Sequence, residues 1–205
     1  MAQPIPPGHA DVCMFRPHLN NLPQWPLPAG YRLRLYRPGD EAVWVALHVD
    51  ADLYNDVELA TFERTYGREY AALAERMFFV ETLDGEPAGS ATAWWVDDWG
   101  DGGPWGHVHW VVVARAHQGR GIMRGMMTAV MARMAQSHDR AMLDTNTART
   151  AAVKVYLDAG FSPCPGDLAA ARQLAGWQLV QATLHHPALA GLPPTAARNT
   201  SPGQP

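Results

Sequence analysis

The sequence contains few cysteines and no long apolar run. Cys13 and Cys164 are its two cysteines in 205 residues, which is too few for a disulfide framework. We therefore expect two free thiols in a reducing cytoplasm, and one disulfide between them is the alternative. No apolar run reaches the roughly 18 residues that a membrane-spanning helix requires. Residues 1–8 lack the basic start and apolar core of a secretory signal. We therefore expect a cytoplasmic protein without a membrane partner.

Positive charge is also in short supply. The formal net charge is −4 and the isoelectric point is about 6.1, whereas a general nucleic-acid binder shows a basic face. No internal repeat is found. His107 and His109 are spaced as a pair, but no third ligand follows at a spacing typical of zinc sites. These absences predict neither a nucleic-acid partner nor a bound metal.

Proline content divides the chain into three parts. Seven of the 17 prolines fall within residues 1–30, which predicts an extended, partly ordered arm. Residues 31–186 have the length and apolar content of one compact domain. Residues 187–205 again contain prolines and predict a flexible tail.

Hydrophobic periodicity within residues 31–186 predicts alternating strands and helices. Alternation of apolar and polar residues and turn signals such as Asp84-Gly85 mark the strands, and spacings of three and four residues mark the helices. Strands are predicted at 31–36, 77–82, 88–96, 107–113 and 141–145. Helices are predicted at 40–49, 62–73, 123–134, 150–159 and 167–185, the last one capped by Asp167. The order predicts an α/β fold, with an antiparallel meander in a mixed, mostly antiparallel sheet.

The stretch from 111 to 123 carries the strongest chemical signal. A buried strand leads into a turn with Gly119 and Gly121, and an amphipathic helix begins at once. Free amide groups and the helix dipole make such a helix start a site for phosphate. Arg115, Arg120 and Arg124 add local positive charge. The pattern predicts a ligand that carries phosphate.

Two other phosphate-binding motifs fit this stretch less well. A nucleotide P-loop needs Lys-Ser or Lys-Thr after its last glycine, where this chain has Ile122-Met123. Gly119, Gly121 and Gly125 form a series, and Asp144 lies where a dinucleotide-binding fold places a ribose-binding acid. That fold, however, puts its first glycine directly after the strand, and here five residues intervene. Only about 60 residues remain for its further strands.

The stretch resembles the pyrophosphate-binding motif of the GNAT acetyltransferase superfamily, through Gln118, Gly121 and the preceding strand. The run from Ala152 to Phe161, with Tyr156 and Gly160, looks like the second signature of the same superfamily, A-x-x-x-Y-x-x-x-G-F. The two motifs occur in the expected order, and the resemblance covers roughly residues 31–165. At Met123 the chain departs from the small residue that usually ends the loop motif.

The resemblance implies acetyl-CoA as cofactor and direct attack of an amine on its thioester. It implies that Tyr156 protonates the departing thiolate and that the amide of Val111 polarises the thioester carbonyl. The residues implied to bind the cofactor are Val111, Val112, Val113, Gln118, Gly119, Arg120, Gly121, Ile122, Met123 and Arg124.

His107 and His109 are candidates for taking the proton of the amine, because they alternate on one face of the strand that leads to the thioester site. Their spacing resembles that of serotonin-type aralkylamine N-acetyltransferases, in which paired histidines serve in proton removal. A structural role is the alternative for both. Tryptophans between residues 94 and 110, with Asp97, Asp98 and Asp101, suggest either an aromatic and acidic mouth for a cationic amine or a sheet core with a solvated turn.

The expected function is transfer of an acetyl group to a primary amine of a small molecule. The same chemistry on a protein N-terminus or lysine is one alternative, and a non-catalytic acyl-CoA-binding regulatory module is another. The last predicted helix, 167–185, takes the place of a closing strand pair that the resemblance implies. It either covers the sheet or forms a homodimer contact.

Overall fold

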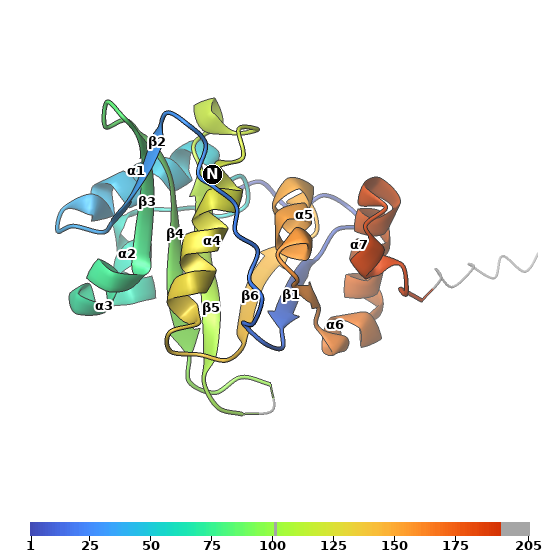
Figure 1. The fold of residues 1–205 in the computed structure, drawn as a ribbon. Coiled ribbons are helices and arrows are strands. Elements are labelled where there is room, and N and C mark those ends of the chain that lie inside the picture. The colour runs from blue at the N-terminus through green and yellow to red at the C-terminus, as the bar shows by residue number, and fades with distance from the viewer. Residues whose placement is uncertain (101, 194–205) are drawn as a thin grey trace, which may run out of the picture.

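The computed structural model describes residues 1–100 and 102–193, and Figure 1 shows a central sheet with helices on both faces. The strands are β1 (Asp11–Arg16), β2 (Tyr31–Leu35), β3 (Met77–Thr82), β4 (Pro87–Val96), β5 (Trp105–Val113), β6 (Ala141–Asn146) and β7 (Ser162–Pro163). The helices are α1 (Asp40–Ala51), α2 (Leu59–Tyr66), α3 (Tyr70–Arg76), α4 (Ile122–Met134), α5 (Thr150–Asp158), α6 (Pro165–Ala169) and α7 (Ala171–Leu184), with short 3-10 turns η1 (Arg115–His117) and η2 (Pro187–Leu189).

The sheet has the strand order β2-β3-β4-β5-β6-β1-β7. Neighbouring strands are antiparallel except β5 and β6, which run parallel because α4 connects them as a crossover. The predicted mixed, mostly antiparallel α/β fold with a meander is therefore confirmed. No helix within the described ranges is long and apolar enough to cross a membrane.

Each face of the sheet carries its own apolar core. The methionines of α4, spaced three and four residues apart, pack on one face together with α5, as Figure 1 shows for the two helices. On the other face Trp44 of α1 packs edge-on against Phe62 and Tyr66 of α2, with ring centroids 5.3 and 6.0 Å apart. The sheet is thus held between two layers of helices, so that its strand ends are fixed in place.

Strand β1 corrects the expectation of an extended arm for residues 1–30. It pairs with β6 from Asp11↔Asn146 to Arg16↔Ala141 and with β7 at Met14↔Pro163 and Phe15↔Ser162. Val12 and Met14 are buried on the α4 side. Proline content misled the prediction because the prolines flank this segment and leave residues 8–16 free to pair. The strand takes the place next to β6.

Three further expectations need correction. The helix predicted at 62–73 is two helices, α2 and α3, because Gly67 ends α2 with φ +58°. The last predicted helix is also two helices, and Asp167 lies within α6 instead of capping a helix. The start of the expected flexible tail is packed, since Leu189 is buried. The rest of that tail, 194–205, and Asp101 lie outside the described residues.

Candidate active site

Strands β5 and β6 separate soon after they meet. They pair only at Gly106↔Ala141 and His107↔Met142. On its other side β5 carries a bulge opposite β4, where Trp110 has φ +47° and the register shifts. Bulges bend a strand and raise its local twist. The bulge turns the end of β5 away from β6, and within the described residues no strand pairs with 108–113 on that side.

The turn after β5 presents a row of free backbone amides. Gly119 has φ +74° and Gly121 φ +85°, a region that glycine enters without strain. Gly121 is the N-cap of α4. Across the described residues, the amides from Gly119 to Met123 donate to no protein acceptor. Together with the positive end of the α4 dipole, they form an anion site of the kind predicted from the sequence.

A cavity of about 780 Å³ lies between this turn, the open edge of β5 and the start of α5. Of the residues predicted to bind the cofactor, all but Arg120 line it: Val111, Val112, Val113, Gln118, Gly119, Gly121, Ile122, Met123 and Arg124. Arg120 turns elsewhere and donates to the hydroxyl of Tyr31 and the carbonyl of Ala116. The departure at Met123 is accommodated, since its side chain packs on the apolar core.

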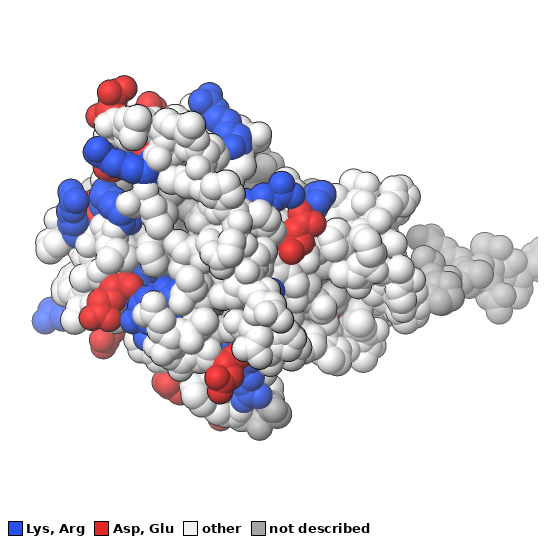
Figure 2. Space-filling model, viewed as in Figure 1, with Lys and Arg blue, Asp and Glu red and all other residues white. Residues whose placement is uncertain are grey.

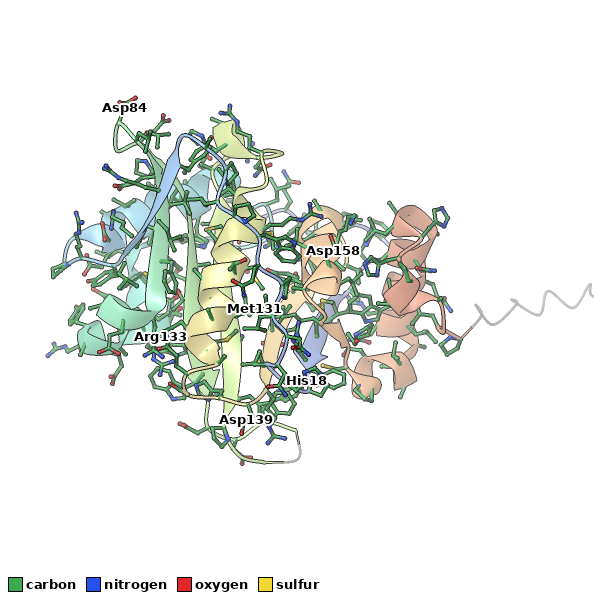
Figure 3. The ribbon with its side chains drawn as sticks, in the orientation of Figure 1. His18, Asp84, Met131, Arg133, Asp139 and Asp158 are labelled. Atoms are coloured by element: carbon green, nitrogen blue, oxygen red, sulfur yellow. The ribbon has the colours of Figure 1, made fainter. Side chains whose placement is uncertain are left out.

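Two of the basic side chains of this cavity, Arg124 and Lys154, are held by one acid. Asp158, at the end of α5 (Figure 3), accepts from Arg124 at 2.7 Å and from Lys154 at 2.9 Å. These contacts lower the pKa of Asp158 to about 2, although burial opposes the shift. Figure 2 shows such clusters of opposite charge scattered over a largely uncharged face. The free amides, the two held cations and the open strand edge fit the pyrophosphate and the amide-containing arm of coenzyme A.

A second cavity of about 700 Å³ adjoins the first. Five residues line both: Asp52, Tyr54, Val111, Arg149 and Ala152. Arg149 donates to Asp52 at 2.6 Å and its guanidinium lies 5.1 Å from the ring centre of Tyr54. We call the first space the cofactor cavity and the second the acceptor cavity, and they meet at Val111.

His107 and His109 both line the acceptor cavity, on the sheet face opposite α4. Their ring centres are 4.3 Å apart. Burial lowers the pKa of His107 to about 4. Burial also lowers the pKa of His109 well below its usual value, with further lowering by His107 and by His48. Both rings are therefore neutral at pH 7, because burial disfavours the protonated form.

Tyr156 reaches the same cavity from α5, so the structure brings together all three residues predicted to act in catalysis. The side chain is 6% exposed, and burial raises its pKa. The hydroxyl therefore stays protonated at neutral pH and can act as a proton donor.

Several residues of the acceptor cavity were not singled out as site residues from the sequence. Asp144 and Asn146 alternate along β6 and share a face, which a period of two could have indicated. The Oδ2 atom of Asp144 lies 3.5 Å from Nε2 of His107. Cys13 and Asp167 also line the cavity, but they arrive there through β1 and α6, whose positions the sequence did not reveal. Within the described ranges no three His, Cys, Asp or Glu side chains are grouped to hold a metal ion.

Comparison with known proteins agrees with this geometry. The model of the acetyltransferase (GNAT) family matches residues 44–161. A mycothiol acetyltransferase from Thermobispora bispora is 32% identical over 154 residues, which are 73% of this chain and 52% of that protein. The chain thus spans about half the length of this relative.

Solved structures share the fold at lower identity. A GCN5-related N-acetyltransferase from Sphaerobacter thermophilus superposes with a TM-score of 0.62 at 21% identity, covering 75% of this chain and 48% of that one. An acetyltransferase of the GNAT family from Colwellia psychrerythraea gives 0.59 at 14% identity, covering 76% and 54%. The span that the family model matches contains β5, the amide-lined turn, α4 and Tyr156, and the chain belongs to the GNAT acetyltransferase family.

Proposed function

We propose that this protein transfers an acetyl group from acetyl-CoA to a primary amine of a small molecule, in a complex that holds both substrates at once. The observation that carries the proposal is the meeting of two cavities at Val111. One has the free amides that suit a pyrophosphate, and the other contains neutral imidazoles and a protonated phenol. Acetyl-CoA would supply the thioester whose C–S bond breaks as the new C–N bond forms.

The cofactor-side residues bind and orient. The amides from Gly119 to Met123 hold the pyrophosphate, and the open edge of β5 at Val111–Val113 pairs with the amide-containing arm. The amide of Val111 donates to the thioester carbonyl and stabilises the negative charge that develops on its oxygen. Arg124 and Lys154, fixed by Asp158, add positive charge nearby.

The acceptor-side residues move protons. The attacking amine must lose a proton, and the neutral rings of His107 and His109 accept it directly or through a water molecule. The carboxylate of Asp144, next to His107, stabilises the imidazolium that forms. Tyr156 gives its proton to the departing thiolate. In this proposal the histidines accept the proton of the amine, and Tyr156 donates the proton that the thiolate takes up.

The test is a calorimetric titration with acetyl-CoA, followed by an amine screen that monitors released thiol. Micromolar binding and amine-dependent thiol release support the proposal. Binding without turnover for any small or peptide amine favours a non-catalytic acyl-CoA-binding module. Release only with peptides favours a protein N-terminal or lysine acetyltransferase. Absence of acetyl-CoA binding overturns the proposal.

A further inference from the structure

Several carboxylates line the acceptor cavity. Asp11, Asp144 and Asp167 line it, and in residues 1–100 and 102–193 none of them forms an ion pair with a lysine or arginine. Arg149 lines the same cavity, but its charge is balanced by Asp52 at 2.6 Å. The cavity therefore has an excess of negative charge.

Strand β1 brings two of these carboxylates together. Cys13 is the cross-strand partner of Asp144, and its backbone N–H donates to Oδ2 of Asp167 at 2.7 Å. Burial and the charge of Asp167 raise the pKa of Asp144. The two acids repel each other, which opposes folding unless a cation lies between or beside them. The fold thus places two carboxyl groups on either side of Cys13 at the cavity wall.

Asn146 gives an independent indication of a ligand. Its side chain is 4% exposed and lines the cavity, and its Oδ1 atom is buried without a hydrogen-bond partner. It alternates with Asp144 along β6, so the two side chains lie on one face. A buried amide oxygen without a donor is costly, whereas a bound N–H donor satisfies it. An ammonium group has three such donors.

We infer that the acceptor is a small polar molecule with at least two amino groups, such as a diamine, a polyamine or a diamino sugar. Asp144, Asp167 and Asn146 hold one group as an ammonium ion, while the other group reacts beside Val111. An amino acid is disfavoured because its carboxylate would meet the carboxylates of the wall. This inference rests on the proposed acetyl transfer and names its substrate class.

The experiment compares acceptors that differ in their second functional group. The first series is 1,4-diaminobutane, 4-amino-1-butanol and 4-aminobutanoate. The second compares 2,6-diamino-2,6-dideoxyglucose with glucosamine, which carries a hydroxyl in place of the second amino group. Thiol release gives kcat/KM for each. We expect the diamino member of at least one series to exceed its monoamino partner by about tenfold or more, the factor of roughly one good charge-assisted contact, with 4-aminobutanoate the poorest.

Isosteric variants then test whether the preference for diamines comes from Asp144 and Asp167. In Asp144→Asn and Asp167→Asn the diamine-to-monoamine ratio should fall towards one, and the amide introduced by Asp167→Asn keeps an oxygen for the N–H of Cys13. Asp144 also contacts His107, so its replacement can slow proton transfer. Such a loss lowers the diamine and monoamine rates alike, and the readout is therefore the ratio of the two rates. Asp84→Asn, at the exposed turn between β3 and β4 (Figure 3), is the control and should leave the ratio unchanged.

The outcomes separate the two proposals. Equal rates for the diamino and monoamino members, or a preference for 4-aminobutanoate, overturn the inference while acetyl transfer stands. Turnover with other monoamines but with neither diamino probe overturns it as well. Failure to bind acetyl-CoA, measured separately by calorimetry, removes the proposed function itself. A preference that survives both Asp variants contradicts the assignment to this wall.

Discussion

The two cavities that meet at Val111 are built in different ways. The phosphate side of the cofactor cavity is formed by one continuous stretch, from β5 through the turn to α4, and it offers free backbone amides to a ligand. The acceptor cavity collects side chains from β1, β5, β6, α5 and α6. Backbone recognition requires glycines at fixed spacings and so leaves a motif, whereas recognition by scattered side chains leaves none.

Replacement of Tyr156 should have the largest effect, because the proposed reaction relies on its hydroxyl as the proton donor. Tyr156→Phe should lower kcat by on the order of 10³-fold, within the range of general acid catalysis, and leave acetyl-CoA binding unchanged. Steady-state kinetics and calorimetry measure the two quantities. Tyr70→Phe, at a half-exposed position on α3, is the control. A kcat within threefold of the parent would rule out proton donation by this hydroxyl.

Strand β1 should matter to the acceptor cavity more than to the cofactor cavity. Met14 is fully buried between Leu143 of β6 and Pro163 of β7. Met14→Ala should lower the free energy of unfolding by about 3 kcal/mol and raise KM for the amine, with little change in acetyl-CoA affinity. Urea unfolding and kinetics test this. Leu33→Ala, on the exposed edge strand β2, should be nearly neutral; equal losses would show that β1 has no special role.

Changes in the turn between β5 and α4 should affect the cofactor cavity more than the acceptor cavity. Gly121→Val forces a β-branched residue into φ +85°, which should weaken acetyl-CoA binding by roughly 100-fold as the amides lose their arrangement. Gly39→Val imposes similar strain at φ +99° at the start of α1, and Gly39 does not line the cavity. Calorimetry on both variants distinguishes general backbone strain from a specific loss of binding. The prediction is contradicted if Gly39→Val weakens acetyl-CoA binding as much as Gly121→Val does.

The last prediction concerns acid stability, where the expected change per pH unit is the smallest of these effects. Burial lowers the pKa of His48 to about 4, below its ordinary value near 6.5, so the unfolded chain binds the extra proton first. Stability is therefore full above pH 6.5 and falls as the pH drops towards 4, by up to about 1.4 kcal/mol per pH unit for this group. His48→Gln should make the stability profile shallower in that window. Exposed His18→Gln is the control, and an unchanged slope in His48→Gln would argue against a buried neutral ring.

The sequence predicted the sheet from β2 to β6 and the glycine-containing turn before α4, because each depends on local periodicity or on glycine spacing. The role of Tyr156 was implied only by the resemblance to the GNAT motif. It could not predict that residues 11–16 pair with residues 141–146, since pairing over such a separation leaves no local pattern. The grouping of Asp144 and Asp167 in the acceptor cavity depends on that pairing. From the sequence alone, Asp167 was therefore expected as a helix cap, and Asp144 was considered only as a ribose ligand. The single helix predicted at 62–73 spans parts of both α2 and α3, because the apolar spacing continues across Gly67.

The position of β1 also determines when the protein can finish folding. Residues 105–156, which form most of the cofactor cavity, meet partners that are close along the chain. Asp11 must wait for Asn146, its register partner. At about 5–20 residues per second of synthesis, that wait is roughly ten seconds. The residues from 148 to 155 that line the cofactor cavity, and Asp167 of the acceptor cavity, emerge later still. Strand β1 is therefore without its partner β6 while most of the sheet is being synthesised.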